Sequence, residues 1–184
     1  TPLTSIMGWL ALLRDRLPPG DDTLTELERD VGRLNKVSTR FGQIGSQPRL
    51  EPGDLVAVVE ETITYFRRRL PHLGGRVELR SEGAAGNPVR FNRDLMEWVL
   101  ENLIKNAIDA LEQGKGTVTV RLSDRPEGGV ALRVRDTGRG IKPSYRAKLF
   151  EPGVSSKARG WGMGLALVKR IVTQYHGGRI RVES

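Results

Sequence analysis

The residues best suited to chemistry lie between Asp136 and Leu165, where two glycine clusters flank a polar loop. The first cluster spans residues 136–141 (DTGRGI) and the second spans residues 160–165 (GWGMGL). Glycine lets a backbone bend sharply or approach a ligand closely, because it has no Cβ. The second cluster runs into an apolar helical pattern, so free N–H groups and the positive end of a helix dipole would meet there, which suits phosphate. A single glycine cluster is more often an ordinary turn, so a phosphate site needs further residues to support it.

Two asparagines, Asn102 and Asn106, lie four residues apart in a segment with helical periodicity. That spacing places both side chains on one face of a helix, about one turn apart. Asparagine is unfavourable inside a helix, and its amide oxygen is a hard, neutral ligand that Mg²⁺ accepts beside phosphate oxygens and water. Lys105 and Asp109 lie beside the same face. The alternative is a pair of asparagines hydrogen-bonded to neighbouring backbone.

Asp136 ends an alternating strand pattern and precedes the first glycine turn. A carboxylate there can accept a hydrogen bond from an exocyclic amine, which would select adenine over guanine. The alternative is an aspartate that only caps the turn. Lys157, in the polar loop, can meet a terminal phosphate as a point charge, and its alternative is a solvated loop lysine.

The composition bounds the classes of protein to consider. The chain has 184 residues, of which 38% are hydrophobic and 28% charged, as is typical of a folded domain. It has no cysteine and two histidines, His72 and His176, which excludes disulfides, thiol chemistry and a histidine-based metal site. We expect no membrane contact from these residues and no secretory signal, because no apolar run reaches the length of a membrane span.

The formal net charge is +8, and basic residues cluster tightly only at Arg67–Arg69. No aromatic residues are interleaved with them in the way that stacks bases, so we expect no nucleic-acid partner. The charge favours an anionic nucleotide and an acidic protein partner. The alternative is a solvated surface with no partner.

Two helices are expected at the start of the chain, over Thr1–Leu17 and Thr23–Ile44, because apolar residues recur there at three- and four-residue steps. The turn at residues 18–22 would make them an antiparallel hairpin. A hairpin alone leaves apolar faces uncovered, so we expect it to pair with a second copy in a four-helix bundle. The alternative is that it packs on the rest of the chain.

The remaining chain alternates helices and strands behind a linker at Gly45–Gly53. Helices are expected from the cap Asp54 to Leu70, from Asn92 or Asp94 to Glu112, and over Met163–Tyr175. The expected strands are Arg76–Arg80, Pro88–Phe91, Val118–Leu122, Val130–Val134 and Arg179–Glu183.

Four motifs in this order resemble the sensor histidine kinases of two-component systems. Residues 102–110 (NLIKNAIDA) resemble their N box, 136–140 their first glycine box, 149–152 (LFEP) their F box and 160–165 their second glycine box. The resemblance implies an α+β protein, in which the helical hairpin of residues 1–46 precedes an ATP-binding Bergerat α/β sandwich with a mixed sheet at residues 50–184.

The resemblance also implies roles for individual residues toward ATP and Mg²⁺. Asn106 would hold Mg²⁺, with Asn102 near it, and Asp136 would bind the adenine amine. The lid over the nucleotide would span Phe150–Gly162. The other residues that the resemblance places around ATP are Lys105, Asp109, Gly138, Gly140, Ile141, Lys157, Gly160, Met163, Gly164 and Leu165.

Thr1-Pro2-Leu3 resembles the end of the phosphoacceptor motif of that family, whose histidine would precede Thr1. We therefore expect a fragment that lacks the acceptor histidine and the closing strand of its ATP-binding domain. Thr1 would assist hydrolysis of the partner's aspartyl phosphate. His72 and His176 lie in no matching context and are expected to be ordinary surface residues.

The predicted function is the ATP-binding core of a sensor histidine kinase, which passes the γ-phosphoryl to a histidine and then to an aspartate of a response regulator. The expected form is a cytoplasmic homodimer, and an inner-membrane anchor of the full-length protein stays an open alternative. A conformational ATPase is disfavoured, because such proteins carry a glutamate where Asn102 stands. The hairpin disfavours an anti-sigma kinase. A nucleotide-binding scaffold without kinase activity is the remaining alternative.

Overall fold

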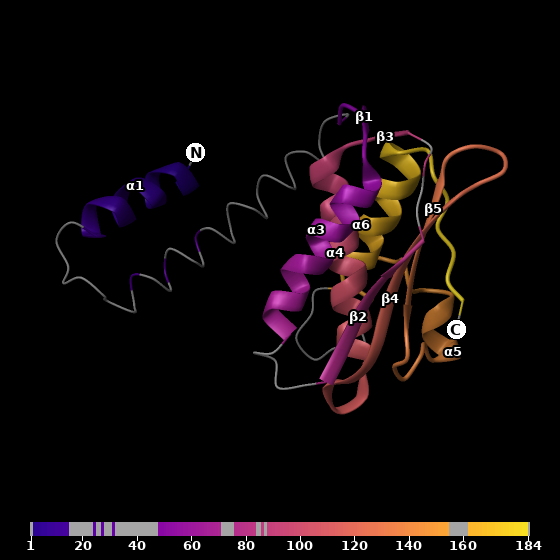
Figure 1. Cartoon of the computed structure of the whole chain (residues 1–184). Helices are drawn as coiled ribbons and strands as arrows, with labels where there is room; N and C mark the ends of the chain where they lie inside the picture. The colour runs from indigo at the N-terminus through magenta and orange to yellow at the C-terminus, as the bar shows by residue number, and fades with distance from the viewer. Residues whose placement is uncertain are drawn as a thin grey trace. The chain divides into compact units, whose positions relative to one another are not determined.

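The computed structural model describes residues 2–14, 24, 27, 31, 48–70, 76–83, 86, 88–154 and 162–183. The chain divides into two units, Thr1–Pro48 and Arg49–Ser184 (Figure 1). None of the described helices is both long and apolar enough to cross a bilayer.

The first unit contains helix α1 (Pro2–Arg14), within the predicted Thr1–Leu17. Leu10 of this helix is buried with Leu24 and Val31, which are also helical. Much of the predicted second helix lies outside the described residues. Five large apolar side chains of α1 remain between 44% and 67% exposed, namely Ile6, Met7, Trp9, Leu12 and Leu13.

The second unit is built on a mixed sheet, as predicted. Strand β4 (Lys115–Asp124) is central, with β2 (Arg76–Glu82) parallel on one side and β5 (Val130–Asp136) antiparallel on the other. A smaller antiparallel pair joins β1 (Glu51–Gly53) to β3 (Val89–Phe91). The hairpin between β4 and β5 closes through the Arg125 N–H, which donates to the Gly129 carbonyl over 3.0 Å.

Helices α3 (Leu55–Arg69) and α4 (Arg93–Ala110) cover one face of this sheet (Figure 1). Each begins at a side-chain cap, because Asp54 Oδ1 accepts from Val56 and Ala57, and Asn92 Oδ1 accepts from Leu95. The main core joins both helices to the sheet, and its fully buried members include Val58, Ile63, Leu100, Ile104, Val118 and Val120.

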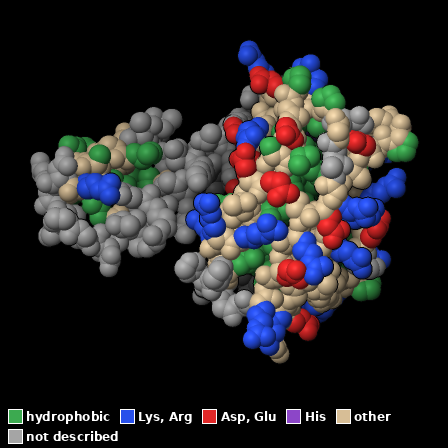
Figure 2. Space-filling model, in the orientation of Figure 1, with side chains coloured by type: hydrophobic (Ala, Val, Ile, Leu, Met, Phe, Trp, Pro, Cys, Tyr) green, Lys and Arg blue, Asp and Glu red, His purple; other side chains and the backbone are tan. Residues whose placement is uncertain are grey.

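The chain then forms a short helix α5 (Pro143–Arg146), a helix α6 (Gly164–Arg170) and a π-helical turn η3 (Ile171–Tyr175) that continues α6. A short helical turn η2 (Glu112–Gly114) links α4 to β4. On the face seen in Figure 2, basic side chains of this unit are interspersed with acidic ones.

Two sequence predictions about this unit are wrong. No strand forms at residues 179–183, although polar and apolar residues alternate there, because these residues do not pair with a strand of either sheet. The predicted linker ends in a strand, since residues 51–53 pair with residues 89–91. Three residues are too few for periodicity to reveal a strand.

Candidate functional site

One face of α4 changes from apolar to polar along the helix. Leu95, Val99, Asn102 and Asn106 recur at three- and four-residue steps and therefore share a face. The two aliphatic residues are at most 1% exposed and pack against α6 and η3. The face becomes polar at Asn102, the position where α6 begins against it.

Asn102 links the N box to the second glycine box. Its Nδ2 donates to the Trp98 carbonyl over 2.9 Å, so the predicted alternative of a backbone hydrogen bond holds for this nitrogen. Its Oδ1 lies only 2.7 Å from the position that a Cβ on Gly164 would take. A side chain at residue 164 would therefore displace the amide, which explains the glycine.

Asn106 follows one turn later and is half-buried, while Lys105 and Asp109 beside it are exposed. Among the described residues, no group of three or more His, Cys, Asp or Glu side chains could hold a metal ion. An amide oxygen at this face can bind a cation beside oxygens that a ligand and water bring.

Asp136 ends β5 opposite Val118 and is partly buried. Its Oδ1 accepts a hydrogen bond from the Gly138 N–H over 2.9 Å, so the predicted turn cap is present. Within the described residues, the second oxygen, Oδ2, makes no hydrogen bond. One carboxylate can thus hold the turn with one oxygen and offer the other to a ligand amine.

The first glycine box packs on the end of α4. The Arg139 N–H donates to the Ala110 carbonyl over 3.1 Å. A Cβ on Gly138 would lie 2.4 Å from that same carbonyl oxygen, so only glycine permits the approach. At position 140 the backbone conformation favours glycine, because φ is +66°. Ile141, which follows, is half-buried.

Within the predicted lid, Phe150–Gly162, Gly153 contacts the last residue, Gly162. The Gly153 N–H donates to the Gly162 carbonyl over 3.2 Å. Gly162 has a φ of +62°, and a Cβ there would lie 2.4 Å from the Gly153 carbonyl carbon. Lys157 and Gly160 lie between these two glycines, outside the described residues, and Thr1 is also outside them.

Met163 and Leu165 flank the first residue of α6, and both are half-buried. Met163 caps the helix through its backbone, because its carbonyl accepts from the Leu167 N–H over 3.0 Å. Phe150 of the F box is half-buried, and its ring centroid lies 5.9 Å from Nζ of Lys169. We did not single out Lys169 from the sequence, since a contact across nineteen positions leaves no local pattern.

The prediction that His176 is an ordinary surface residue is wrong. The Asn92 N–H donates to its Nε2 over 3.1 Å, and its Nδ1 lies 2.9 Å from the Ile171 carbonyl. The first contact requires an acceptor and the second a donor, so we assign the tautomer with the proton on Nδ1. His176 thereby ties the end of η3 to the start of α4. His72 lies outside the described residues.

Comparison with known proteins identifies the family of this chain. Residues 91–184 match the family described as histidine kinase-, DNA gyrase B- and HSP90-like ATPases. The signal transduction histidine-protein kinase AtoS of Escherichia coli is 32% identical over 189 residues, which cover 100% of this chain and 30% of AtoS. The chain thus spans less than half the length of the curated relatives it matches.

Two solved structures share the fold. Full-length ShkA in complex with AMPPNP has a TM-score of 0.70 at 24% identity, over 94% of this chain and 38% of ShkA. The histidine kinase ThkA in complex with the response regulator protein TrrA has a TM-score of 0.60 at 19% identity, over 97% of this chain and 52% of that one.

Proposed function

Because this chain belongs to the family of histidine kinase-, DNA gyrase B- and HSP90-like ATPases, we propose that its second unit binds ATP as the catalytic domain of a sensor histidine kinase. The observation that carries the proposal is the convergence of three motifs on α4. Gly164 abuts Asn102, and the loop after Asp136 docks through Gly138 on Ala110. The domain would span residues 50–184.

Asp136 would select adenine, with its Oδ2 accepting from the exocyclic amine while Oδ1 holds the turn. Gly138, Gly140 and Ile141 would line the base. The phosphates would then lie at the start of α6, enclosed by the residues Gly162, Met163, Gly164 and Leu165. Phe150, Lys157 and Gly160 belong to the proposed lid, with Lys157 near the terminal phosphate.

Mg²⁺ fits the donor set of this site. Mg²⁺ keeps several waters and takes few protein ligands beside phosphate oxygens, and α4 offers neutral amide oxygens. Asn106 would hold the ion, with Asn102 next to it and Lys105 and Asp109 beside them. When bound, the ion would neutralise phosphate charge.

Asn102 favours phosphoryl transfer over ATP hydrolysis. An amide cannot act as the base that activates water, and this amide already donates to the Trp98 carbonyl. The chain would therefore position ATP and exclude water, and transfer would depend on an acceptor brought to the γ-phosphate. We place that acceptor histidine in the intact protein, from which the phosphoryl group would pass to an aspartate of a response regulator.

The first unit, residues 1–46, would be the dimerisation and phosphotransfer hairpin. The exposed apolar side chains of α1, including Trp9 at 67% exposure, support pairing with a second copy. Thr1 would assist hydrolysis of the regulator's aspartyl phosphate. The histidine kinase ThkA, which shares this fold, has been solved with a response regulator, which supports a receiver domain as the partner. We place this chain in the cytoplasm.

Two measurements test the proposal. Calorimetric titration of this chain with Mg-ATP is expected to show one site per second unit. The intact gene product, given γ-labelled ATP, is expected to form an acid-labile and base-stable phosphohistidine. ATP binding without any phosphohistidine would favour the scaffold alternative, and a folded chain without ATP binding would refute both.

A further inference from the structure

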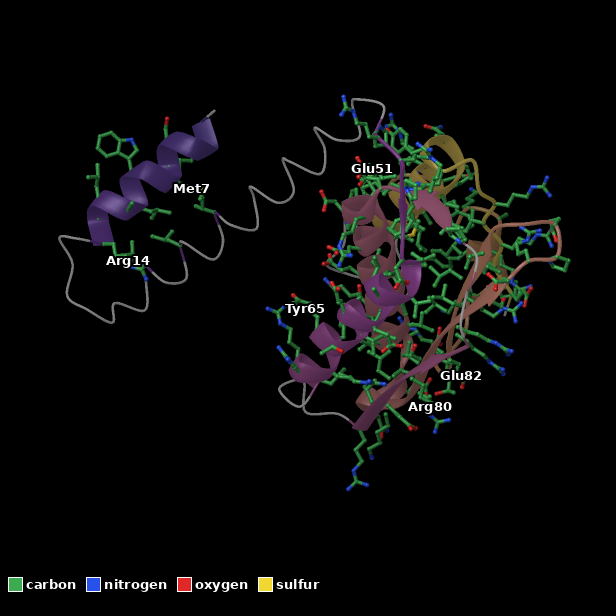
Figure 3. All side chains as sticks on the ribbon, turned by 45° about the horizontal axis from the view of Figure 1, so that its top comes forward. Met7, Arg14, Glu51, Tyr65, Arg80 and Glu82 are labelled. Carbon is green, nitrogen blue, oxygen red and sulfur yellow. The ribbon has the colours of Figure 1, made fainter. Side chains whose placement is uncertain are left out.

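The face of the sheet that α3 and α4 leave open is strongly basic. Side chains alternate between the two faces along each strand, and Leu79, Val118, Val120 and Leu122 point to the core. The opposite face presents six basic and two acidic residues, namely Arg76, Arg80, Lys115, Arg121, Arg133, Arg135, Glu78 and Glu82. Figure 3 shows Arg80 and Glu82 on the side of β2 away from α3.

Charge is distributed unevenly across this face. Both glutamates belong to β2, where Glu78 pairs with Arg80 over 2.7 Å. On the same face, Arg121 of β4 has Glu82 of β2 as its register partner on one side and Arg133 of β5 on the other. Arg135 follows Arg133 by two residues and therefore shares its face. We call Arg121, Arg133 and Arg135 the arginine triad.

The arginine triad is exposed and has no internal partner. In the described part of the chain, its side chains make neither an ion pair nor a hydrogen bond, and all three residues are exposed. Like charges directly opposite on neighbouring strands destabilise a sheet. Glu82 of β2 offsets this repulsion for Arg121, whereas neither Arg133 nor Arg135 has an acidic partner in the ladder between β4 and β5, so an external anionic group would lower the repulsion there.

We propose that the open face of the sheet, centred on the arginine triad, docks an acidic polypeptide segment. Guanidinium groups bind carboxylates through two parallel hydrogen bonds. Residues two apart on one strand recur at about 6.8 Å, and alternate residues of an extended peptide recur at the same distance. Thr119, which shares this face, adds a hydroxyl group for hydrogen bonding to such a segment.

The composition of the face favours a polypeptide over the other anionic partners. It carries no aromatic side chain on which a base could stack. Its only apolar outward side chain is the small Ala131, which cannot anchor in a bilayer. Nucleotide binding would be independent, because Asp136 and the core residues of β5 point to the other face.

A triple variant tests the proposal: Arg121→Gln, Arg133→Gln and Arg135→Gln. The matched control neutralises three exposed arginines elsewhere, as Arg49→Gln, Arg68→Gln and Arg181→Gln, and so lowers the net charge equally. The probe is a fluorescent peptide of alternating glutamate and serine, followed by anisotropy. Its counterpart with glutamine in place of glutamate, single-stranded DNA and phosphatidylserine vesicles are titrated in parallel.

The triad variant is expected to bind the acidic peptide about tenfold more weakly than wild type, by analogy with the loss of three exposed ion pairs. It should keep wild-type ATP affinity, and its thermal stability should be equal to that of wild type or higher, because the repulsion between Arg121 and Arg133 is removed. The control should keep most of the peptide affinity, and added salt should weaken the wild type. Equal loss in both variants would overturn the proposal, because net charge alone would explain binding. Tighter triad-dependent binding of DNA or vesicles would overturn the choice of a polypeptide.

Discussion

Asp136→Asn separates the two tasks that we assign to this carboxylate. Asparagine has the same shape, and its amide oxygen can still accept the Gly138 N–H that Asp136 Oδ1 accepts over 2.9 Å. The second oxygen becomes an NH₂ group, which faces the adenine amine with a donor instead of an acceptor. The turn should therefore persist while the base contact is lost.

The expected loss follows from the strength of one hydrogen bond to a charged group, about 1.5–3 kcal/mol. This corresponds to a roughly tenfold to 150-fold rise in the Kd of Mg-ATP. GTP should respond differently, because guanine presents a carbonyl oxygen where adenine presents its amine. The new NH₂ group can donate to that oxygen, so the preference for ATP over GTP should fall by more than the ATP affinity itself.

Calorimetric titration of both nucleotides, with urea unfolding of each variant, measures these effects. Asp124→Asn is the matched control, because that aspartate also accepts a backbone N–H, from Gly86 over 2.9 Å, but lies away from the motifs. Wild-type ATP affinity in Asp136→Asn would refute the adenine contact. Equal losses for ATP and GTP together with reduced stability would show that Asp136 only holds the turn.

Three further substitutions test the packing around the site and the open face. Gly164→Ala should lower the free energy of unfolding by about 1–3 kcal/mol and weaken ATP binding, because its Cβ would meet Asn102 Oδ1 at 2.7 Å. His176→Ala should cost about 1–3 kcal/mol, measured by urea unfolding, because a part-buried N–H at the start of α4 loses its acceptor. Arg80 lowers the pKa of Glu78, chiefly through its hydrogen bond. The pair therefore stabilises the fold above the ordinary glutamate pKa, and this is lost as pH falls through the lowered value. Arg80→Gln should return the pKa of Glu78 toward its ordinary range in an NMR titration.

Matched substitutions control these predictions. Gly86→Ala is the control for Gly164→Ala. Its Cβ would lie at an ordinary 3.7 Å from the nearest atom, so it should leave the free energy of unfolding almost unchanged. Gln174→Ala changes an exposed residue near His176 and should not alter stability by more than about 0.5 kcal/mol. Wild-type stability in Gly164→Ala or His176→Ala would contradict the contacts assigned to them, and an unchanged Glu78 titration in Arg80→Gln would contradict that ion pair.

Local patterns in the sequence were sufficient for most elements of the second unit. The cap at Asp54, the helix that contains Asn102 and Asn106, and the alternating strands β4 and β5 lie where periodicity and capping chemistry place them. Such signals depend only on residues within a few positions of one another. Because these signals are local, the alternation of polar and apolar residues at 179–183 led to a wrong strand prediction. A strand also needs a neighbouring strand to pair with, and local spacing does not show whether one is present.

The sequence by itself determined the family, the order of its motifs and the residue types available for nucleotide and cation. Only the tertiary structure decided which groups meet: the amide of Asn102 against Gly164, the turn of Gly138 against the end of α4, and His176 against Asn92. It also gathered basic residues from separate strands on one open face. These contacts join residues that are distant along the chain, so they depend on how helices and strands pack and leave no trace in local spacing.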